Sequence, residues 1–286
     1  MRWVALLVVA CACDRVLGLR DTQLADGPAP DSPPVCPALL GAPPTFSGVL
    51  RQVIPQQCTD YTIAPLAGRA LTVCFETNAT ISDYYVAEGA VAGPVAKVSG
   101  FDALTNVRID PSGDTAFAFD GAAYVRYQRT GDLAWSRGAP IARFASYTYA
   151  TTATAGANPH VLLGDGSQFI ELEDDGTDTW STVTGMYSGT MFAGATMISR
   201  PTWTVDGLRL VFVAASLIAS PGQSFAVMYA SRQNIGDTFG PAVEAAAFEP
   251  YVDPSRVFAQ QILGYLDDDC GRFYFAALSS VLYAQQ

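Results

Sequence analysis

The stretch Asp206-Gly207-Leu208-Arg209-Leu210-Val211-Phe212 contains the pattern that decides the fold. A tight-turn dipeptide is followed by apolar residues three and five positions after its glycine. Because alternate side chains of a strand point to the same face, this spacing predicts a strand that enters from a turn and places one face in a core.

The same pattern recurs along the chain at intervals of roughly 40–60 residues. Each anchor is a turn residue followed by two positions of the core face: Gly68 with Leu71 and Val73, Asp114 with Phe117 and Phe119, Gly166 with Phe169 and Glu171, Asp206-Gly207 with Leu210 and Phe212, and Asp269-Cys270 with Phe273 and Phe275. The third repeat is the weakest, because Glu171 stands where an apolar residue is expected. Short strands repeated at this interval are typical of a β-propeller, with one blade per repeat.

In three repeats a proline follows the anchor, at Pro94, Pro140 and Pro241. An aromatic-rich strand is expected between each anchor and its proline. Since proline is tolerated where a strand edge faces solvent, we expect it to begin the outer strand of a blade. The sequence therefore predicts an all-β propeller of five or six four-stranded blades. A β-sandwich or another all-β fold is the alternative.

The two ends of the chain predict how the ring of blades closes. The last repeat ends at Gln286 before it reaches an outer strand, and residues 46–54, ahead of the first full repeat, have strand character. A propeller must join its last blade to its first or leave an open edge. We expect residues 46–54 to supply the missing strand. Residues 244–266 are either a long loop or a degenerate sixth blade.

The amino terminus resembles a bacterial lipoprotein signal. Residues 4–10 are apolar but too few to span a bilayer, and small residues lead to Cys11 and Cys13, either of which is a candidate for lipidation. An ordinary secretory signal is the alternative. We expect a signal peptide over residues 1–13, a proline-rich tether over 14–45 and the propeller over 46–286. The protein is then anchored by its N-terminal lipid in a bacterial cell envelope, or otherwise secreted.

Cysteine usage and charge narrow the function. Four cysteines follow the signal, Cys36, Cys58, Cys74 and Cys270, which in an exported protein suggests two disulfides of undetermined pairing, with free thiols as the alternative. Their wide spacing argues against a zinc site. The net charge is −11, with 27 acidic and 16 basic residues, so nucleic-acid binding is excluded as a function class.

Residues 201–214, a proline followed by Asp206-Gly207 and alternating apolar residues, resemble the WD40-like repeat of TolB-type propellers. The last repeat, which begins at Asp267, is similar to the closing repeat of such proteins among bacterial envelope lipoproteins. The resemblance implies a scaffold that binds other proteins or small ligands through its faces, with no common chemistry. We therefore expect a binding protein with an envelope protein as partner, no cofactor and no enzymatic activity.

A carbohydrate-binding or glycoside-hydrolysing propeller is the alternative function. Such glycosidases use two carboxylates at strand starts near the central channel. The candidate acids are Asp110, Asp206, Asp269, Glu171, Asp174 and Asp175. Those in turns are explained more simply as caps of their own turns.

Other chemistry finds little support in the sequence. His160 is the single histidine and is expected in a turn, with an exposed or structural role rather than a catalytic one. Residues 171–178 and 267–269 are acidic enough to bind calcium, but solvated loop acids are the expected interpretation. Trp135, Trp180 and Trp203 are expected in blade cores, with a sugar-stacking surface as the alternative.

Overall fold

The computed structural model divides into two compact units, Met1–Pro34 and Val35–Gln286. It describes residues 36, 38–46, 50–54, 60–66, 69–77, 82–88, 95–101, 105–110, 114–131, 134–147, 149–155, 158–175, 179–183, 187–188, 197–216, 224–248, 265–266, 270–277 and 280–286. The lipidation candidates Cys11 and Cys13 lie outside these ranges. Within them, no helix has the length and apolar character needed to cross a membrane.

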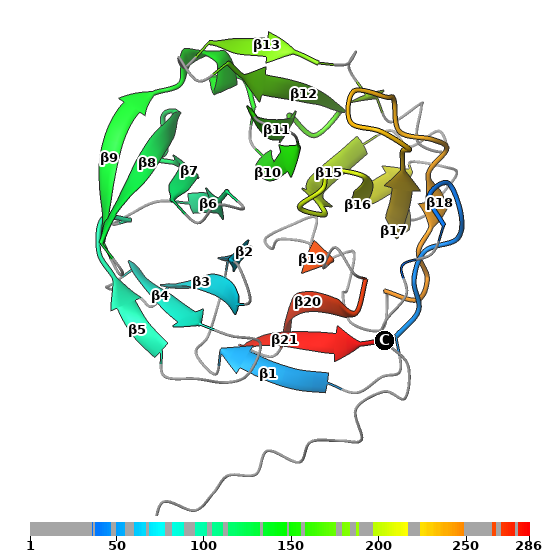
Figure 1. Cartoon of the computed structure of the whole chain (residues 1–286), viewed down its shortest axis with the longest axis horizontal. Coiled ribbons are helices and arrows are strands. Elements are labelled where there is room, and N and C mark those ends of the chain that lie inside the picture. The colour runs from blue at the N-terminus through cyan, green and yellow to red at the C-terminus, as the bar shows by residue number, and fades with distance from the viewer. Residues whose placement is uncertain are drawn as a thin grey trace, which may run out of the picture. The chain divides into compact units, whose positions relative to one another are not determined.

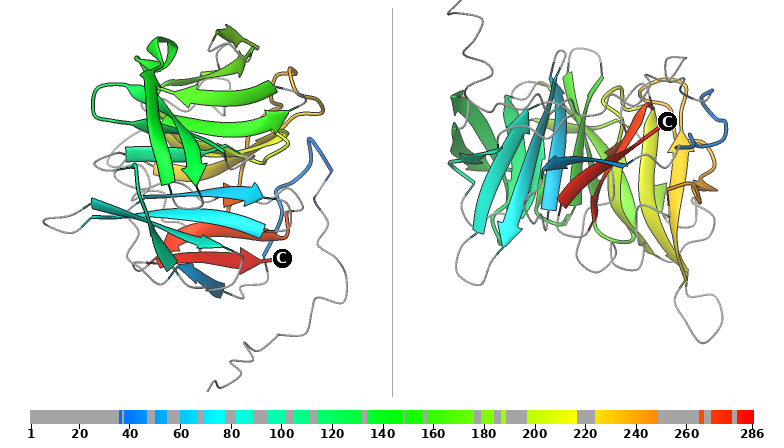
Figure 2. Two further views of the ribbon diagram at one scale, coloured as in Figure 1. Left: turned by 60° about the vertical axis from the view of Figure 1, so that its left-hand side comes forward. Right: turned by 90° about the horizontal axis from the view of Figure 1, so that it is seen from below.

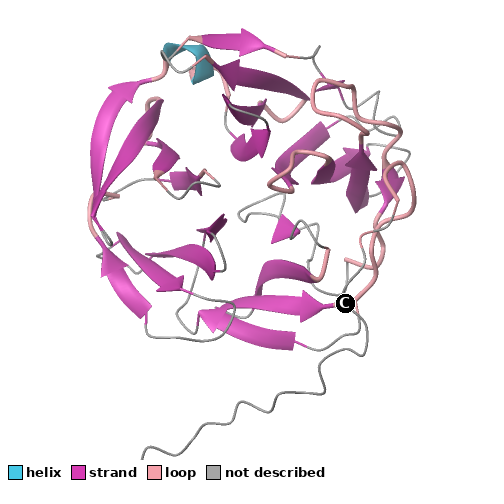
Figure 3. Ribbon diagram, viewed as in Figure 1, coloured by secondary structure: helices cyan, strands magenta, loops and turns pink. Residues whose placement is uncertain are grey.

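The second unit is an all-β fold of five antiparallel sheets, which confirms the predicted propeller (Figure 1). In four of the sheets the first strand in chain order lies nearest the centre of the ring, and in the fifth, which also contains the N-terminal strand, the innermost strand is the one at Tyr265–Leu266. Within the ranges given above, the one helical element is the 3-10 turn η1 (Ala142–Phe144), drawn in cyan in Figure 3. Since five sheets account for all the described strands, the blade number is five in this part of the chain.

The blades follow the chain order. Blades one and two consist of β2 (Asp60–Leu66), β3 (Arg69–Thr77), β4 (Ser82–Glu88) and β5 (Val95–Val98), then β6 (Thr105–Ile109), β7 (Thr115–Phe119), β8 (Tyr124–Gly131) and β9 (Ala134–Pro140). Blades three and four consist of β10 (Tyr149–Ala155), β11 (Asn158–Gly164), β12 (Gln168–Asp174), β13 (Trp180–Thr182) and the short β14 (Tyr187–Ser188), then β15 (Met197–Trp203), β16 (Arg209–Ser216), β17 (Ser224–Ser231) and β18 (Val243–Glu244). Blade five consists of β19 (Tyr265–Leu266), β20 (Arg272–Ala277), β21 (Ser280–Gln285) and β1 (Leu50–Ile54).

Strand β16 shows why each sheet needs a neighbour on both faces. Phe212 packs against Phe169 of blade three, with ring centroids 5.7 Å apart, while Val211 and Val213 belong to the cluster that contains Phe273 of blade five. Because successive side chains point to opposite faces, a strand buried on both sides is apolar at nearly every position. A single blade would therefore expose two apolar faces to water.

The anchor turns precede the second strand in four blades. Asp206 and Gly207 lead into β16, and Cys270 leads into β20, with φ angles of 67° for Gly207 and 58° for Cys270. The position of Gly166 differs from the expectation, because it joins β11 to β12, the second and third strands of blade three. The first and second strands of that blade are β10 and β11, which pair up to Ala155 and Asn158. Gly166 mimics the repeat because it also occupies a tight turn with positive φ, at 96°.

The outer strands follow the proline pattern in two of three blades. Strands β5 and β18 begin shortly after Pro94 and Pro241 in the sequence. In blade two the expectation is wrong, because Pro140 is the last residue of β9. The proline still falls at the periphery of the sheet, where a missing N–H group is tolerated.

The predicted closure by an N-terminal strand is confirmed. Strand β1 pairs antiparallel with β21, with Leu50 opposite Ala284 and Ile54 opposite Val281 (Figure 2). Blade five therefore combines strands from both ends of the chain. Of residues 244–266, the range 249–264 lies outside the described residues, and the rest contributes parts of β18 and β19 rather than a sixth sheet.

A disulfide between Cys36 and Cys270, 234 residues apart in sequence, adds a covalent link to the same blade. Phe46 lies between Cys36 and β1 in the sequence. Its ring packs on those of Phe248 and Phe273, at centroid distances of 5.3 and 5.8 Å. The end of the segment predicted as a tether is thus bonded to the propeller. Of the other two candidates, Cys58 is not described, and the side chain of Cys74 in β3 is not described either, so a second disulfide stays a prediction.

Deleting residues 46–54 should abolish the cooperative unfolding transition, because blade five would lose its outer strand and, with it, the pairing that joins the N-terminal segment to β21. Urea unfolding followed by tryptophan fluorescence measures this, since Trp135, Trp180 and Trp203 are all buried in blades two to four. Deletion of residues 26–34 is the matched control and should leave the transition unchanged. A 46–54 deletion with the stability of the full chain would contradict closure by this strand.

Replacing Cys36 and Cys270 together by serine should lower the free energy of unfolding by about 2–4 kcal/mol, because the unfolded chain regains the freedom of a very long loop. Chemical denaturation with and without reductant measures this change. If the reduced native chain loses more stability than the double variant, a second disulfide exists. Equal stability of the double variant and the oxidised native chain would show that the link contributes nothing.

Candidate functional site

The inner strands β2, β6, β10, β15 and β19 surround the centre of the ring (Figure 1), and two of them are bulged. The pairing of β6 with β7 shifts between Thr105 and Arg108, and that of β15 with β16 between Ser199 and Thr202. Arg200 lies in the second bulge with a φ of 54°, in the left-handed region that few residues with a side chain adopt. Bulges and such backbone conformations concentrate beside functional sites, so the inner strands are one candidate site.

The candidate acids next to the inner strands cap turns. Asp110 accepts a hydrogen bond from the Thr115 amide at 3.2 Å. Asp206 accepts one from the Leu208 amide at 2.9 Å and another from the hydroxyl of Thr204. Both acids follow the last residue of an inner strand, whereas the glycosidase alternative expects carboxylates at strand starts. Their geometry therefore supports the simpler interpretation as turn caps.

Of the remaining turn acids, only Asp114 is described, and it adds no second carboxylate to this region. Asp114 is exposed, and its carbonyl oxygen accepts hydrogen bonds from the Arg129 amide and the Gln128 side chain. Asp269, like Asp267 and Asp268, is not described. In the part of the chain that the structure describes, no group of three or more His, Cys, Asp or Glu side chains could hold a metal ion.

Glu171 is the centre of a buried ion-pair network between blades three and four. Both oxygens accept hydrogen bonds from Arg232, at 2.5 Å from Nη1 and 3.0 Å from Nη2, and both side chains are fully buried. Arg232 also donates to the carbonyl oxygens of Gly207 at 2.9 Å and Asp237 at 3.2 Å. His160 Nδ1 lies 3.1 Å from Glu171 Oε1. A bidentate, fully hydrogen-bonded pair is the geometry in which a buried charge is tolerated.

This network corrects two expectations. Glu171 was expected in an irregular blade or an acidic loop, but it lies in β12. His160 was expected in a turn, but it lies in β11 and is 3% exposed, which makes it a structural histidine. Burial acts to raise the pKa of Glu171, but the hydrogen bonds from His160 and Arg232 and the charge of Arg232 outweigh burial and lower its pKa.

Asp174, three residues further along β12, makes the equivalent contact with the other neighbour. It is 2% exposed and forms an ion pair with Arg126 of β8 in blade two. Residues 171 and 174 lie on opposite faces of the strand, so β12 presents one carboxylate to each neighbouring blade. The expectation of solvated loop acids or a calcium loop is therefore wrong for both, and of this segment only Asp175 is an exposed acid that the structure describes.

The two arginines share a second feature, because each lies over aromatic rings. Arg232 lies 5.5 Å from the ring centroid of Trp203, and Arg126 lies 5.7 Å from that of Trp180. Trp135, Trp180 and Trp203 are 6, 8 and 1% exposed, which confirms the prediction of core positions. Sequence reasoning missed both arginines. The signal that could have found Arg232 is a charged residue, Glu171, between the apolar residues Ile170 and Leu172 of β12.

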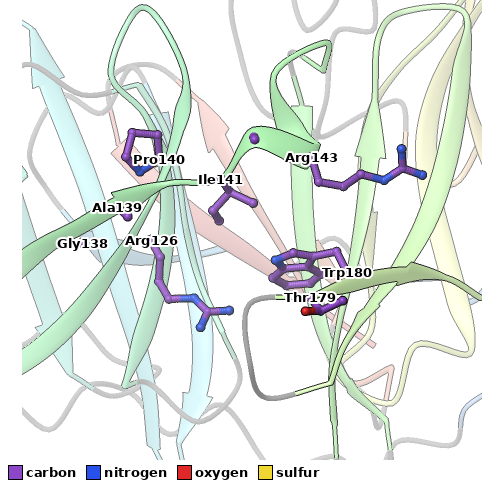
Figure 4. Close-up of a pocket in the computed structure, with 9 residues that line it drawn as sticks. Arg126, Gly138, Ala139, Pro140, Ile141, Arg143, Thr179 and Trp180 are labelled. Atoms are coloured by element: carbon purple, nitrogen blue, oxygen red, sulfur yellow. The ribbon is translucent and has the colours of Figure 1, made fainter.

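A pocket of about 600 Å³ lies between blades two and three, away from the inner strands. It is lined by Arg126 of β8, the stretch 138–143 that leaves β9, and Thr179 and Trp180 at the start of β13 (Figure 4). The pocket lies beside a bulge, because Val125 pairs with Pro140 and Tyr127 with Arg137, so that two residues of β9 oppose Arg126 alone. Such bulges redirect neighbouring side chains and interrupt pairing.

Glycine is required at the bulge. A Cβ atom at Gly138 would lie 2.9 Å from the carbonyl oxygen of Arg126, closer than side chains are found. The local backbone of β8 and β9 can therefore approach this closely only without a side chain at position 138. The pocket is built into the pairing of these two strands.

Comparison with known proteins identifies the fold. No protein-family model and no curated protein sequence matches the chain. A solved structure from the GH130 family, described as including glycoside hydrolases that target β-1,2-mannosidic linkages in Candida mannan, matches with a TM-score of 0.57 and 10% identity over 88% of this chain and 96% of that one. A candidate glycoside hydrolase from Parabacteroides distasonis matches with a TM-score of 0.52 and 10% identity over 86% and 96%.

TolB from Acinetobacter baumannii also matches, with a TM-score of 0.47 and 13% identity over 86% of this chain and 65% of that one. The chain spans less than two thirds of TolB, and 42% of the matched Bacteroides ovatus xyloglucan PUL GH43B chain. At these identities the likeness shows a propeller fold. It does not assign the chain to the TolB type.

The expectation that the protein is not an enzyme is contradicted by these comparisons. It followed from the resemblance to binding propellers of the TolB type. The structural neighbours with TM-scores above 0.5 instead include the GH130 structure and the candidate glycoside hydrolase from Parabacteroides distasonis. The fold that this chain shares with them is one that supports catalysis as well as binding.

Replacing Arg232 by methionine should lower the free energy of unfolding by about 3–5 kcal/mol, because Glu171 would be left as a buried charge without its cation. The double variant Arg232→Met/Glu171→Leu should lose much less, since both charges are removed together. Urea unfolding at neutral pH measures both. Arg137→Met is the control, because its partner Asp120 is an exposed acid, and little change is expected. A double variant as unstable as the sum of the single variants would contradict this account.

The lowered pKa of Glu171 also predicts how stability depends on pH. A carboxyl group whose pKa is lower in the folded state contributes stability above its unfolded value, roughly 4.3, and loses it as the pH falls through the folded value. The difference in unfolding free energy between the native chain and Glu171→Gln should therefore be constant from pH 6 to 8, approximately, and shrink below about pH 4. A difference independent of pH throughout the acid range would count against an ionised Glu171.

Proposed function

We propose that the protein is a carbohydrate-active propeller that binds a saccharide at the centre of the ring and hydrolyses a glycosidic bond. The observation that carries the proposal is the extent of the shared fold. The match covers 96% of each of two neighbours whose TM-scores exceed 0.5. In proteins of that size, the residues that act on a saccharide have to be part of the propeller itself, since little else remains.

The inner strands support the same location. The bulges in β6 and β15 place Arg108 and Arg200 at irregular positions of the innermost layer. Asp60 is the first residue of β2, the position in an inner strand at which glycosidase propellers are expected to carry an acid.

Asp102, Glu249 and Asp253 precede other inner strands in sequence and lie outside the described residues. A second carboxylate is required for hydrolysis, and these three acids are its candidates.

Screening a panel of oligosaccharides for release of reducing sugar tests the proposal, with β-1,2-linked mannosides included. Asp60→Asn should reduce turnover at least about 100-fold, the effect of losing a general acid or base. Asp206→Asn is the matched control, because it removes a carboxylate that caps a turn, and turnover should be retained. No hydrolysis anywhere in the panel, or turnover that survives an amide at Asp60, Asp102, Glu249 and Asp253 in turn, would overturn the proposal.

We further propose that the protein is exported. The Cys36–Cys270 disulfide supports this, because such bonds persist in oxidising compartments. Lipid attachment at Cys11 or Cys13, an envelope location and a protein partner there are predictions from the N-terminal sequence and the resemblance. Mass spectrometry of the protein purified from membranes of a bacterial host tests them, since it identifies both the modified cysteine and any crosslinked partner.

A further inference from the structure

We propose that the pocket between blades two and three binds the carboxylate group of a small organic anion. This site is separate from the ring centre and goes beyond the proposed hydrolysis. Its residues come from β8, the end of β9 and the start of β13, which belong to the outer half of two neighbouring blades (Figure 1).

The charge of the lining is the first argument. The chain has a net charge of −11, yet the charged side chains that line this pocket are two arginines, and none of the lining residues is acidic. Arg126 is paired with Asp174, which lies behind it. Arg143 is exposed, and the one hydrogen bond that its side chain makes to a described residue goes to the Thr182 hydroxyl at 3.3 Å. Its positive charge is therefore not neutralised by a carboxylate in that part of the chain.

The indole of Trp180 is the second argument. The side chain is 8% exposed, and its Nε1 has no hydrogen-bond partner among the described residues. A buried N–H donor without an acceptor is costly, so such a group is uncommon unless water or a ligand completes it. Figure 4 shows the indole nitrogen on the edge of the ring that is turned toward Arg126 and Ile141, two other residues that line the pocket.

The other residues that line the pocket indicate which kind of anion it binds. Pro140, Ile141 and the alanines at 139 and 142 are apolar, and they cover one side of the space. Figure 4 shows Arg143 extending past Trp180 and away from Arg126, so its exposed side chain stands at the rim. An anion with a compact carbon body and one carboxylate matches apolar walls, an indole donor and a guanidinium at the rim. A volume of about 600 Å³ is large enough for one or two sugar rings.

Titration of ¹⁵N-labelled protein with sodium glucuronate and, separately, sodium benzoate tests the proposal by NMR. The Trp180 indole resonance, assigned as the one missing from Trp180→Phe, should shift and saturate with at least one of them, whereas glucose should leave it unchanged. Saturation by glucuronate alone identifies a sugar acid as the ligand class. Saturation by both identifies the carboxylate as the recognised group. The readout needs no turnover, so it is independent of whether the protein hydrolyses glycosides.

Arg143→Ala should weaken binding of the effective probe roughly tenfold, the loss of one charge-assisted hydrogen bond. Arg137→Ala is the matched control, because Arg137 is an exposed arginine of the same strand region that does not line the pocket and pairs with Asp120. Both variants change exposed side chains, and thermal unfolding verifies that each one is folded. No saturable shift with either carboxylate, or equal weakening by the two variants, would overturn the proposal.

Discussion

The pairing of β1 with β21 is the constraint on which the rest of the structure depends. In the blades whose side chains the structure describes, both faces of a sheet are buried, so such a blade cannot end the row without exposing an apolar face. Blade five meets this requirement with strands from both termini and a disulfide from Cys36 to Cys270. The two ends of a 286-residue chain are thereby brought into one sheet. Loops on the two rims of the ring can then vary without loss of the core.

Blade three is stabilised in a different way from the others. Its third strand, β12, carries a carboxylate on each face, Glu171 toward blade four and Asp174 toward blade two, and each is paired with an arginine that lies over an aromatic ring. Polar contacts of this kind require one relative position of two sheets, whereas apolar packing tolerates sliding. The two pairs thus specify how blade three fits between its neighbours, at the cost of burying charge.

The repeat pattern was sufficient to predict the fold, because tight turns and alternating apolar residues are local features that blades must share. The unfinished last repeat was likewise sufficient to predict that an N-terminal strand completes blade five. The sequence failed where partners are distant in the chain. Glu171 was interpreted as a defect of the repeat, since nothing near it in sequence shows that Arg232 would neutralise it. The bulge at Gly138 and the pocket beside it follow from a pairing offset between β8 and β9, which no local pattern encodes.

The two candidate sites differ in how the fold constrains them. Every blade contributes one inner strand to the centre of the ring. The geometry of a binding site there therefore depends on the arrangement of all the blades. The pocket depends on one outer strand, β9, whose pairing with β8 is interrupted at Arg126. An outer strand has solvent on its far edge, so an extra residue there costs little ladder pairing. A second site is therefore gained more easily at the periphery, and Gly138 is the residue whose missing side chain permits the irregular pairing there.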